Sequence, residues 1–447
     1  MVWLLPFDAI ELPVHLPLDA KLDRLLLLVA GALWLSSLVS GLADVRPRLR
    51  LGAVHLAVIG FLLIATIGTL HNATMLAGLG ELSLSIKKLA LLASFAFFFV
   101  IVASVVRPTE VSRFVLLMLG LATVGAIGTL VEYRIHYNPF YEWAGKLPFV
   151  DVLEPSDLDQ PDSIGRISIY GAAGSPIENA TMFALALPFA LIRLIDATTW
   201  RRRLVYLAVA TILVSGAMST ARKTSVIACA AGFVVLLAYR HRRLTRALIP
   251  MFAAFVVMIH VLAPQAMGSL LQQLNPDRAT RVLSTRDRAS DYDGVSPDIA
   301  AHPLFGRGYK SFDPLTYRIL DNEYLGLIVG VGIVGLLAYL MVLLVSFLAA
   351  HQVARANDPI WSPLAMASAC TIVVVALSTG LFDLLSFPHI PYAFFFVVAL
   401  VVVCRDSLAI ALPAPGTIGR DATGGITPRT SPRRRKNIFE PAKEIGS

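Results

Sequence analysis

Long apolar blocks separated by short polar segments run along most of the chain. Residues 25–43, 94–106 and 322–350 form three such blocks, and charged residues bound each of them. A helix that crosses the hydrocarbon core of a membrane needs about 20 mostly apolar residues. The pattern therefore predicts transmembrane helices rather than the core of a water-soluble domain.

Reading the blocks with breaks at proline, glycine and charge predicts an all-α fold, a polytopic transmembrane helical bundle of about 11 to 12 spans with two external loops. The expected spans are 24–43, 51–70, 84–106, 111–131, 176–195, 204–220, 223–239, 244–263, 322–350, 362–383 and 388–404. The chain then has three parts: an N-terminal interfacial segment at 1–23, a transmembrane domain at 24–404, and a basic cytoplasmic tail at 405–447 that we expect to be disordered.

Composition agrees with a membrane protein. Hydrophobic residues make up 56% of the 447 positions and charged residues only 15%, and the mean hydropathy is +0.71. The net charge of +8 comes mainly from arginines in short clusters between apolar blocks, so no basic soluble domain exists to bind nucleic acid. The three cysteines all lie in apolar blocks without metal-ligand spacing, so we expect neither disulfides nor a metal site.

The arginine clusters predict the topology. Short basic segments follow every second span, at 46–50, 107–113, 193–203, 240–246 and 355 and in the tail. The segments between them are long or poor in basic residues, at 71–83, 132–175, 264–321 and 384–387. By the positive-inside rule the first set is cytoplasmic and the second external, which puts the tail inside and the N-terminus outside.

The stretch 204–239 is too long for one span, and its two basic flanks both favour the cytoplasm. The chain must therefore cross twice and turn at Ser219-Thr220-Ala221-Arg222-Lys223, at the outer end of a helical hairpin. Charges at such a depth indicate a functional site. The alternative is that Arg222 and Lys223 extend to the outer lipid headgroups.

The loop at 264–321 is rich in arginine for an external segment. Long loops are translocated largely regardless of charge, so the topology stands. Guanidinium groups gathered outside, near Arg222 and Lys223, predict a site for a phosphorylated ligand such as a lipid-pyrophosphate carrier. Contact with ordinary lipid headgroups is the alternative. The loop at 132–175 supplies aromatic and acidic residues and then Arg166, just before the next helix.

The arginine-rich loop ends in His302-Pro303-Leu304-Phe305-Gly306-Arg307-Gly308, a turn-rich approach to the membrane, and then in Asp321-Asn322. Either residue of the last pair is also suited to capping the following helix. Within that helix, Gly326 and Gly330 have the spacing of small-residue helix packing.

Together these segments resemble the O-antigen ligase and polymerase superfamily of bacterial membrane glycosyltransferases. The 219–223 turn looks like the family's Ser-x-Ser-Arg element. Arg286 and Arg288, followed by the 302–308 segment, look like the arginine and Pro-Leu-Phe-Gly-x-Gly stretch of its large external loop. Asp321-Asn322 with Gly332 and Gly335 is similar to its His-Asn, spacer, Gly-x-x-Gly element, and Arg166 with Pro176 to a weaker stretch.

The resemblance implies a polyprenyl-pyrophosphate-linked glycan donor, an acceptor hydroxyl on a glycan, lipid or protein, and chemistry that needs no cofactor and no metal. By this reading Arg222, Arg288 and Asp321 are catalytic. The substrate-binding residues are Lys223, Arg286, Arg166, His302 and Asn322. The two arginines neutralise the pyrophosphate, and Asp321 orients or deprotonates the acceptor, with His302 as the other candidate base.

The chain departs from the family pattern at Asp321, where ligases acting on lipid A core carry histidine. A carboxylate accepts a proton but repels pyrophosphate, which argues against that particular acceptor. The predicted function is cell-surface polysaccharide synthesis in the cytoplasmic (inner) membrane, by a polymerase or a ligase with its active site on the outer face. The alternative is a lipid-linked oligosaccharide flippase or other polysaccharide transporter, which typically has internal repeats and midplane polar groups.

Overall fold

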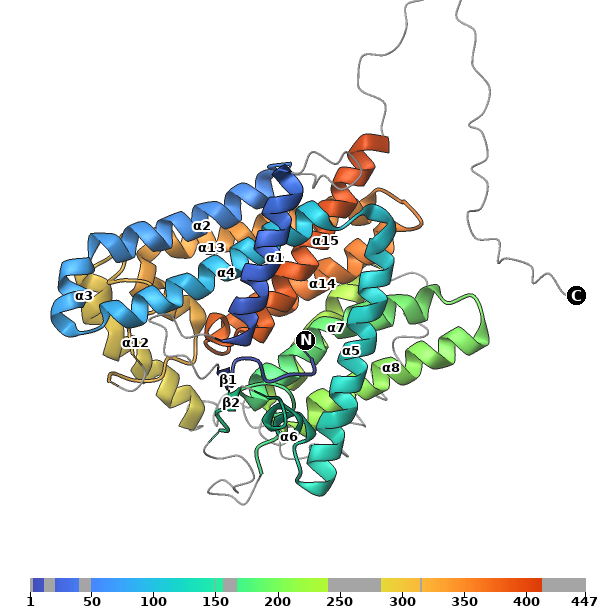
Figure 1. The fold of residues 1–447 in the computed structure, drawn as a ribbon, viewed down its shortest axis with the longest axis horizontal. Coiled ribbons are helices and arrows are strands. Elements are labelled where there is room, and N and C mark those ends of the chain that lie inside the picture. The colour runs from blue at the N-terminus through green and yellow to red at the C-terminus, as the bar shows by residue number, and fades with distance from the viewer. Residues whose placement is uncertain are drawn as a thin grey trace, which may run out of the picture. The chain divides into compact units, whose positions relative to one another are not determined.

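The computed structural model describes residues 3–11, 21–39, 50–148, 150–155, 167–239, 283–313 and 316–411, with backbone alone at 283–290 and 410–411. These residues form an almost entirely helical fold (Figure 1). The helices are α1 (Leu22–Val39), α2 (Ala53–His71), α3 (Ala73–Leu79), α4 (Leu82–Val105), α5 (Pro108–Ile135), α6 (Pro139–Gly145), α7 (Pro176–Asp196), α8 (Trp200–Ser219), the helix Lys223–Tyr239, α12 (Leu283–Ala301), α13 (Glu323–Arg355), α14 (Trp361–Thr379), the short 3-10 helix η1 (Leu384–Ser386) and α15 (His389–Ala411). Two short strands, β1 (Ile10–Glu11) and β2 (Asp151–Val152), pair antiparallel.

Within the described residues, nine helices are long and apolar enough to span a membrane: α1, α2, α4, α5, α7, α8, α13, α14 and α15. The helix Lys223–Tyr239 is apolar but shorter. These ten helices coincide with ten of the predicted spans, which confirms the all-α polytopic prediction. The remaining predicted span, 244–263, and the tail beyond 411 lie outside the described residues. The fold also has α3, α6 and α12 within segments that we expected only as loops.

Local sequence explains where several helices begin. Pro108 and Pro176 occupy the first turns of α5 and α7, where the missing amide hydrogen costs nothing. The Ser175 hydroxyl accepts a hydrogen bond from the Ile177 amide, and Thr199 caps α8 in the same way. Proline and capping hydroxyls therefore end the loops at the predicted boundaries.

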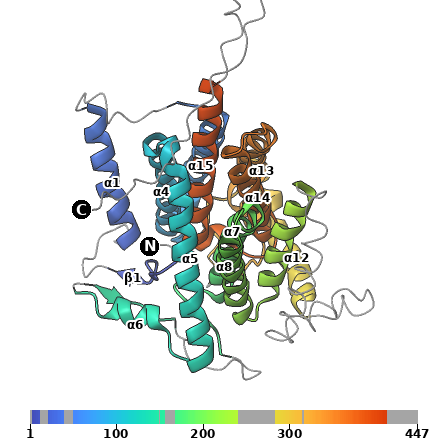
Figure 2. The ribbon, with the colours of Figure 1, turned by 90° about the vertical axis from the view of Figure 1, so that its right-hand side faces the viewer.

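The central helix is α7, which packs against α5, α8 and α14. In the 18-residue apolar stretch of α7, 83% of the residues are buried, against 11% in the corresponding stretch of α1. Figure 2 shows α1 to one side of the other helices. Because lipid chains are as apolar as leucine, an outer helix keeps its apolar side chains exposed, as Leu28 and Leu33 of α1 do.

The segments predicted to be external contact one another. Glu81, between α3 and α4, pairs with Arg307 in the arginine-rich loop. Lys310 of that loop pairs with Asp383, beside η1. The N-terminal strand β1 pairs with β2 in the 132–175 segment. In Figure 2, α6 and β1 lie towards the lower end, away from the upper end where α15 finishes. These contacts agree with one shared side for the N-terminus and the predicted external segments.

Candidate functional site

The 219–223 turn joins α8 to the helix Lys223–Tyr239, as predicted. Thr220 follows the last residue of α8, and Ala221 takes a left-handed conformation with φ of 52°. The Thr220 hydroxyl lies 3.0 Å from the Ser225 hydroxyl, which ties the two helix ends together. The turn therefore presents Arg222 and Lys223 from a backbone that is fixed on both sides.

Arg222 is the predicted catalytic residue that the structure describes best. Its side chain is half-buried, and its Nη2 donates a 3.3 Å hydrogen bond to the hydroxyl of Ser168 in the loop before α7. In the part of the chain that the structure describes, no carboxylate pairs with its guanidinium. The hydrogen bond directs the guanidinium towards the loop before α7. Lys223 beside it is also half-buried.

Three of the predicted site residues have no side chain among the residues that the structure describes. Arg166 lies outside the described residues, two positions before Ser168. Arg286 and Arg288 belong to α12, in the part where only the backbone is described. Their roles therefore remain predictions.

The 302–308 segment packs along α13 where that helix is broken. Gly332 has φ of 67°, so the backbone leaves the helical path there. The amides of Arg307 and Gly308 donate to the carbonyls of Val329 and Gly330, both at 2.9 Å. Beyond the break, the amides of Ile333 and Val334 donate to carbonyls at positions 303 and 304, at 3.0 and 3.2 Å. The loop thus satisfies the backbone groups that the break exposes.

Arg307 within this segment is a structural residue. Its guanidinium contacts Glu81 at 2.7 Å and Asp298 at 3.1 Å, and it lies over the Tyr317 ring. The residue is 3% exposed. Both carboxylates neutralise it, so Arg307 is not available to a pyrophosphate.

Asn322 caps α13. Its side-chain oxygen accepts hydrogen bonds from the amides of Tyr324 and Leu325, which confirms the capping alternative for this residue. Asp321 next to it is exposed, and His302 is half-buried. Within the described residues no hydrogen bond or ion pair joins Asp321 to Arg222 or His302.

Sequence reasoning missed a buried charged cluster at the start of α13. Lys310 lies between Glu323, at 2.9 Å, and Asp383. Burial opposes ionisation of Asp383, but Lys310 outweighs it and lowers the pKa of that carboxyl below its ordinary value. The pKa of Lys310 is raised, since the two carboxylates outweigh the effect of burial. The sequence signal for this cluster was weak. Lys310 lies two positions after the 302–308 segment, and Glu323 follows Asp321-Asn322.

Two further features bear on ligands. Asp8, Glu178 and His389 bring metal-ligating atoms within 4.8 Å of one another, alone among the described groups.

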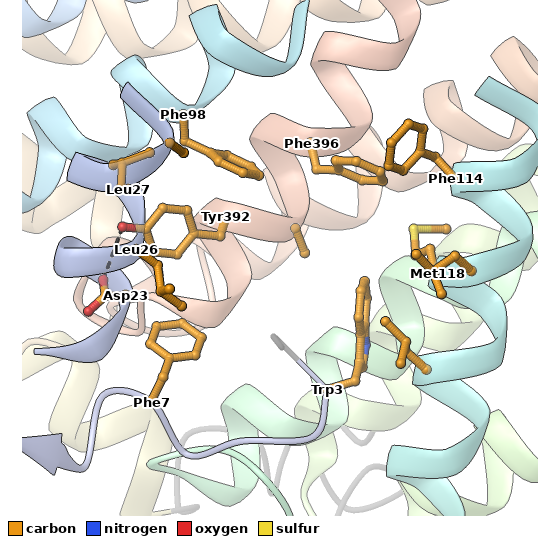
Figure 3. A pocket seen from close by; sticks show the side chains of 14 residues that line it. Trp3, Phe7, Asp23, Leu26, Leu27, Phe98, Phe114, Met118, Tyr392 and Phe396 are labelled. Carbon is orange, nitrogen blue, oxygen red and sulfur yellow. Dashed lines mark hydrogen bonds between the residues drawn. The ribbon is translucent and has the colours of Figure 1, made fainter. Parts of the chain in front are cut away.

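Separately, a cavity of about 390 Å³ lies between α1, α4, α5 and α15 (Figure 3). Its lining is mostly apolar and includes Asp23 and the Tyr392 hydroxyl, which hydrogen-bond each other. A carboxylate repels pyrophosphate, so this cavity does not suit a phosphate group.

Fold and site together define a polytopic membrane protein with a cationic turn and a long arginine-bearing loop. Residues 207–340 match the family model described as O-Antigen ligase. This match supports the O-antigen ligase and polymerase superfamily and a part in cell-surface polysaccharide biosynthesis. The matched range contains the 219–223 turn, α12, the 302–308 segment and the Gly332 break. The chain matches no curated protein.

Proposed function

We propose that the protein transfers a polyprenyl-pyrophosphate-linked glycan to an acceptor hydroxyl on the outer face of the cytoplasmic membrane. The observation that carries this proposal is the contrast between two arginines of the matched region. Arg307 is neutralised by two carboxylates, whereas the described partner of Arg222 is the neutral Ser168 hydroxyl. An arginine that keeps its charge in a half-buried turn is suited to binding an anionic substrate.

In the reaction, the acceptor oxygen attacks the anomeric carbon of the donor. The new carbon–oxygen bond forms as the bond from that carbon to the phosphate oxygen breaks. Polyprenyl pyrophosphate leaves with the bonding electrons, and the anomeric configuration inverts. Asp321 takes the proton of the hydroxyl, and its exposed position at the start of α13 is compatible with contact to a substrate.

Arg222 and Arg288 neutralise the charge that develops on the leaving group, supported by Lys223, Arg286 and Arg166. Preorganised donors of this kind act without a metal or a nucleotide, and losing one typically costs about 10²–10³-fold in rate. Asn322 holds the start of α13 and thereby the position of Asp321. His302 is the other candidate base.

The test is complementation of a deletion strain with wild type or Arg222→Ala at matched expression. We expect Arg222→Ala to abolish long surface glycan and to leave lipid-linked glycan on the outer face. Single glycan units at the surface would then mark a polymerase, and absence of surface glycan a ligase.

Two control variants sharpen this test. Ser168→Ala removes the hydrogen bond to Arg222 but keeps the positive charge, so most activity should remain. Arg134→Ala removes an exposed arginine near the end of α5 and should have no effect. Accumulation of lipid-linked glycan on the cytoplasmic face would instead identify a transporter and contradict the proposal, as would full activity of Arg222→Ala.

A further inference from the structure

Asp8, Glu178 and His389 come from three separate parts of the chain. Asp8 lies in the N-terminal segment 3–11, Glu178 in the first turn of α7, and His389 at the first position of α15. His389 Nδ1 lies 2.9 Å from Glu178 Oε1 and 3.8 Å from Asp8 Oδ1. Glu178 and His389 are fully buried. One imidazole and two carboxylates therefore meet at a single point inside the protein.

Hydrogen bonds from neighbouring backbone groups hold these side chains in place. Metal-binding side chains are commonly oriented by hydrogen bonds of this kind. His389 Nε2 lies 3.1 Å from the carbonyl oxygen of Leu5, which only accepts, so Nε2 carries hydrogen. Nδ1 faces Glu178 Oε1 at hydrogen-bond distance, so the space between them is filled either by a proton on Nδ1 or by an ion that takes the Nδ1 lone pair. The Gly174 amide donates to Glu178 Oε2 at 3.0 Å, which fixes the orientation of that carboxylate.

The charges of this group are incompletely balanced by the neighbouring residues. Lys21 donates to the backbone carbonyl of Asp8. Asp8 Oδ1 is shielded from solvent and accepts no hydrogen bond, although it faces His389. A proton on Nδ1 would pair with Glu178 and still leave Asp8 Oδ1 without a partner. A divalent cation would bind all three atoms and offset both negative charges.

The geometry points to a binding site for a divalent transition-metal ion, of the Zn²⁺ class, formed by Asp8, Glu178 and His389. Imidazole nitrogen with carboxylate oxygens is a common ligand set for Zn²⁺, and three protein ligands leave one position for water. Its role is structural, because it fastens the N-terminal segment to the starts of α7 and α15. It is separate from the proposed chemistry at Arg222, which uses no metal.

The N-terminal segment that this site holds also lines the cavity of Figure 3. The Phe7 ring lies 4.0 Å from the His389 ring, between centroids, and Phe7 and Trp3 both line the cavity. Trp3 is fastened in turn to α7, since its indole nitrogen donates to the Met182 carbonyl. Loss of the ion should therefore loosen the segment and expose Trp3.

The experiment is metal analysis of the full-length protein, purified in detergent through a tag without histidine. We expect about one Zn²⁺ per wild-type chain after dialysis against Zn²⁺ and then metal-free buffer. Asp8→Asn and Glu178→Gln should bind Zn²⁺ at least about 10-fold more weakly. Asp151→Asn, an exposed acid on β2 beside the same segment, is the matched control and should bind like wild type.

A thermal scan gives the second measurement. Added Zn²⁺ should raise the melting temperature of wild type but not of Asp8→Asn, since a ligand that binds only the folded state stabilises it. The site would be overturned if the wild type bound no metal and neither Zn²⁺ nor a chelator changed its melting temperature. The group would then be a protonated His389 between two carboxylates. Equal binding by Asp8→Asn and wild type would show an adventitious ion only. Arg222→Ala should keep its metal, so failure here and failure of the proposed function are distinguishable.

Discussion

The carbonyl oxygen of Leu304 lies 2.2 Å from where a β-carbon at Gly332 would stand. This approach brings the backbone of the 302–308 segment against the break in α13. It also explains why one short loop and one glycine, 28 positions apart in the chain, form a single structural unit. The same loop backbone passes Gly330, where a β-carbon would lie 3.2 Å from the Gly308 carbonyl.

Replacing Gly332 should therefore be costly. Gly332→Ala adds a β-carbon at this contact and places alanine at positive φ, which alone costs about 1–3 kcal/mol. We expect a lower melting temperature in detergent and loss of glycan transfer. Gly326→Ala, on the same helix with open space around it, should be neutral or slightly stabilising. Equal melting temperatures of the two variants would refute the close packing.

The buried Arg307–Glu81 pair predicts a stability effect rather than a catalytic one. Arg307→Met leaves Glu81 buried without its charged partner, and breaking such a pair typically costs about 3–5 kcal/mol. Arg134→Met is the control, because Arg134 near the end of α5 is exposed, and substitutions at exposed positions typically change stability by no more than about 0.5 kcal/mol. Thermal unfolding of both variants tests this prediction. Equal losses of stability would show that the buried Arg307–Glu81 pair contributes no more than an exposed arginine does.

Asp383 should make stability depend on pH in the acid range. Its folded pKa is lowered below the ordinary 3.8, so its contribution is present above that pH and disappears as pH falls through the folded pKa. Asp383→Asn removes the charge-assisted hydrogen bond from Lys310, and we expect a loss of about 1.5–3 kcal/mol at neutral pH. The difference from wild type should stay constant from about pH 8 to 5 and shrink below about pH 4. A difference that shrinks already near pH 6 would contradict this assignment.

The predicted topology is testable with introduced cysteines, since the three native ones are buried. Asp293→Cys, on the exposed face of α12, should react with a membrane-impermeant maleimide in intact spheroplasts. Arg202→Cys, exposed at the start of α8, should react only after permeabilisation. The reverse pattern would place the site on the cytoplasmic side and exclude the proposed outer-face reaction.

Much of the fold follows from the sequence because a membrane span is a local property. About 20 apolar residues define a helix wherever they occur, and arginines between spans set the topology. For the same reason the turn at 219–223 was predictable, since its two basic flanks require two crossings. The break at Gly332 was not, because neither the Gly326/Gly330 spacing nor the Gly332/Gly335 element indicates at which glycine the helix is broken. In the structure, Gly332 differs from the other three by its positive φ within α13 and its 2.2 Å approach to the loop backbone.

Some properties of the candidate site also follow from the sequence, and others only from the structure. Sequence alone placed both Arg222 and Arg307 in external segments and named only Arg222 as catalytic, without showing which of the two has a carboxylate partner. The structure separates them, because Glu81 reaches Arg307 across 226 positions of the chain while Arg222 contacts a hydroxyl. Glu178 and His389 likewise meet across 211 positions. Sequence predicted which charges lie in the external segments, whereas only the tertiary structure decided which of them are neutralised, because compensation of a buried charge depends on distance in space.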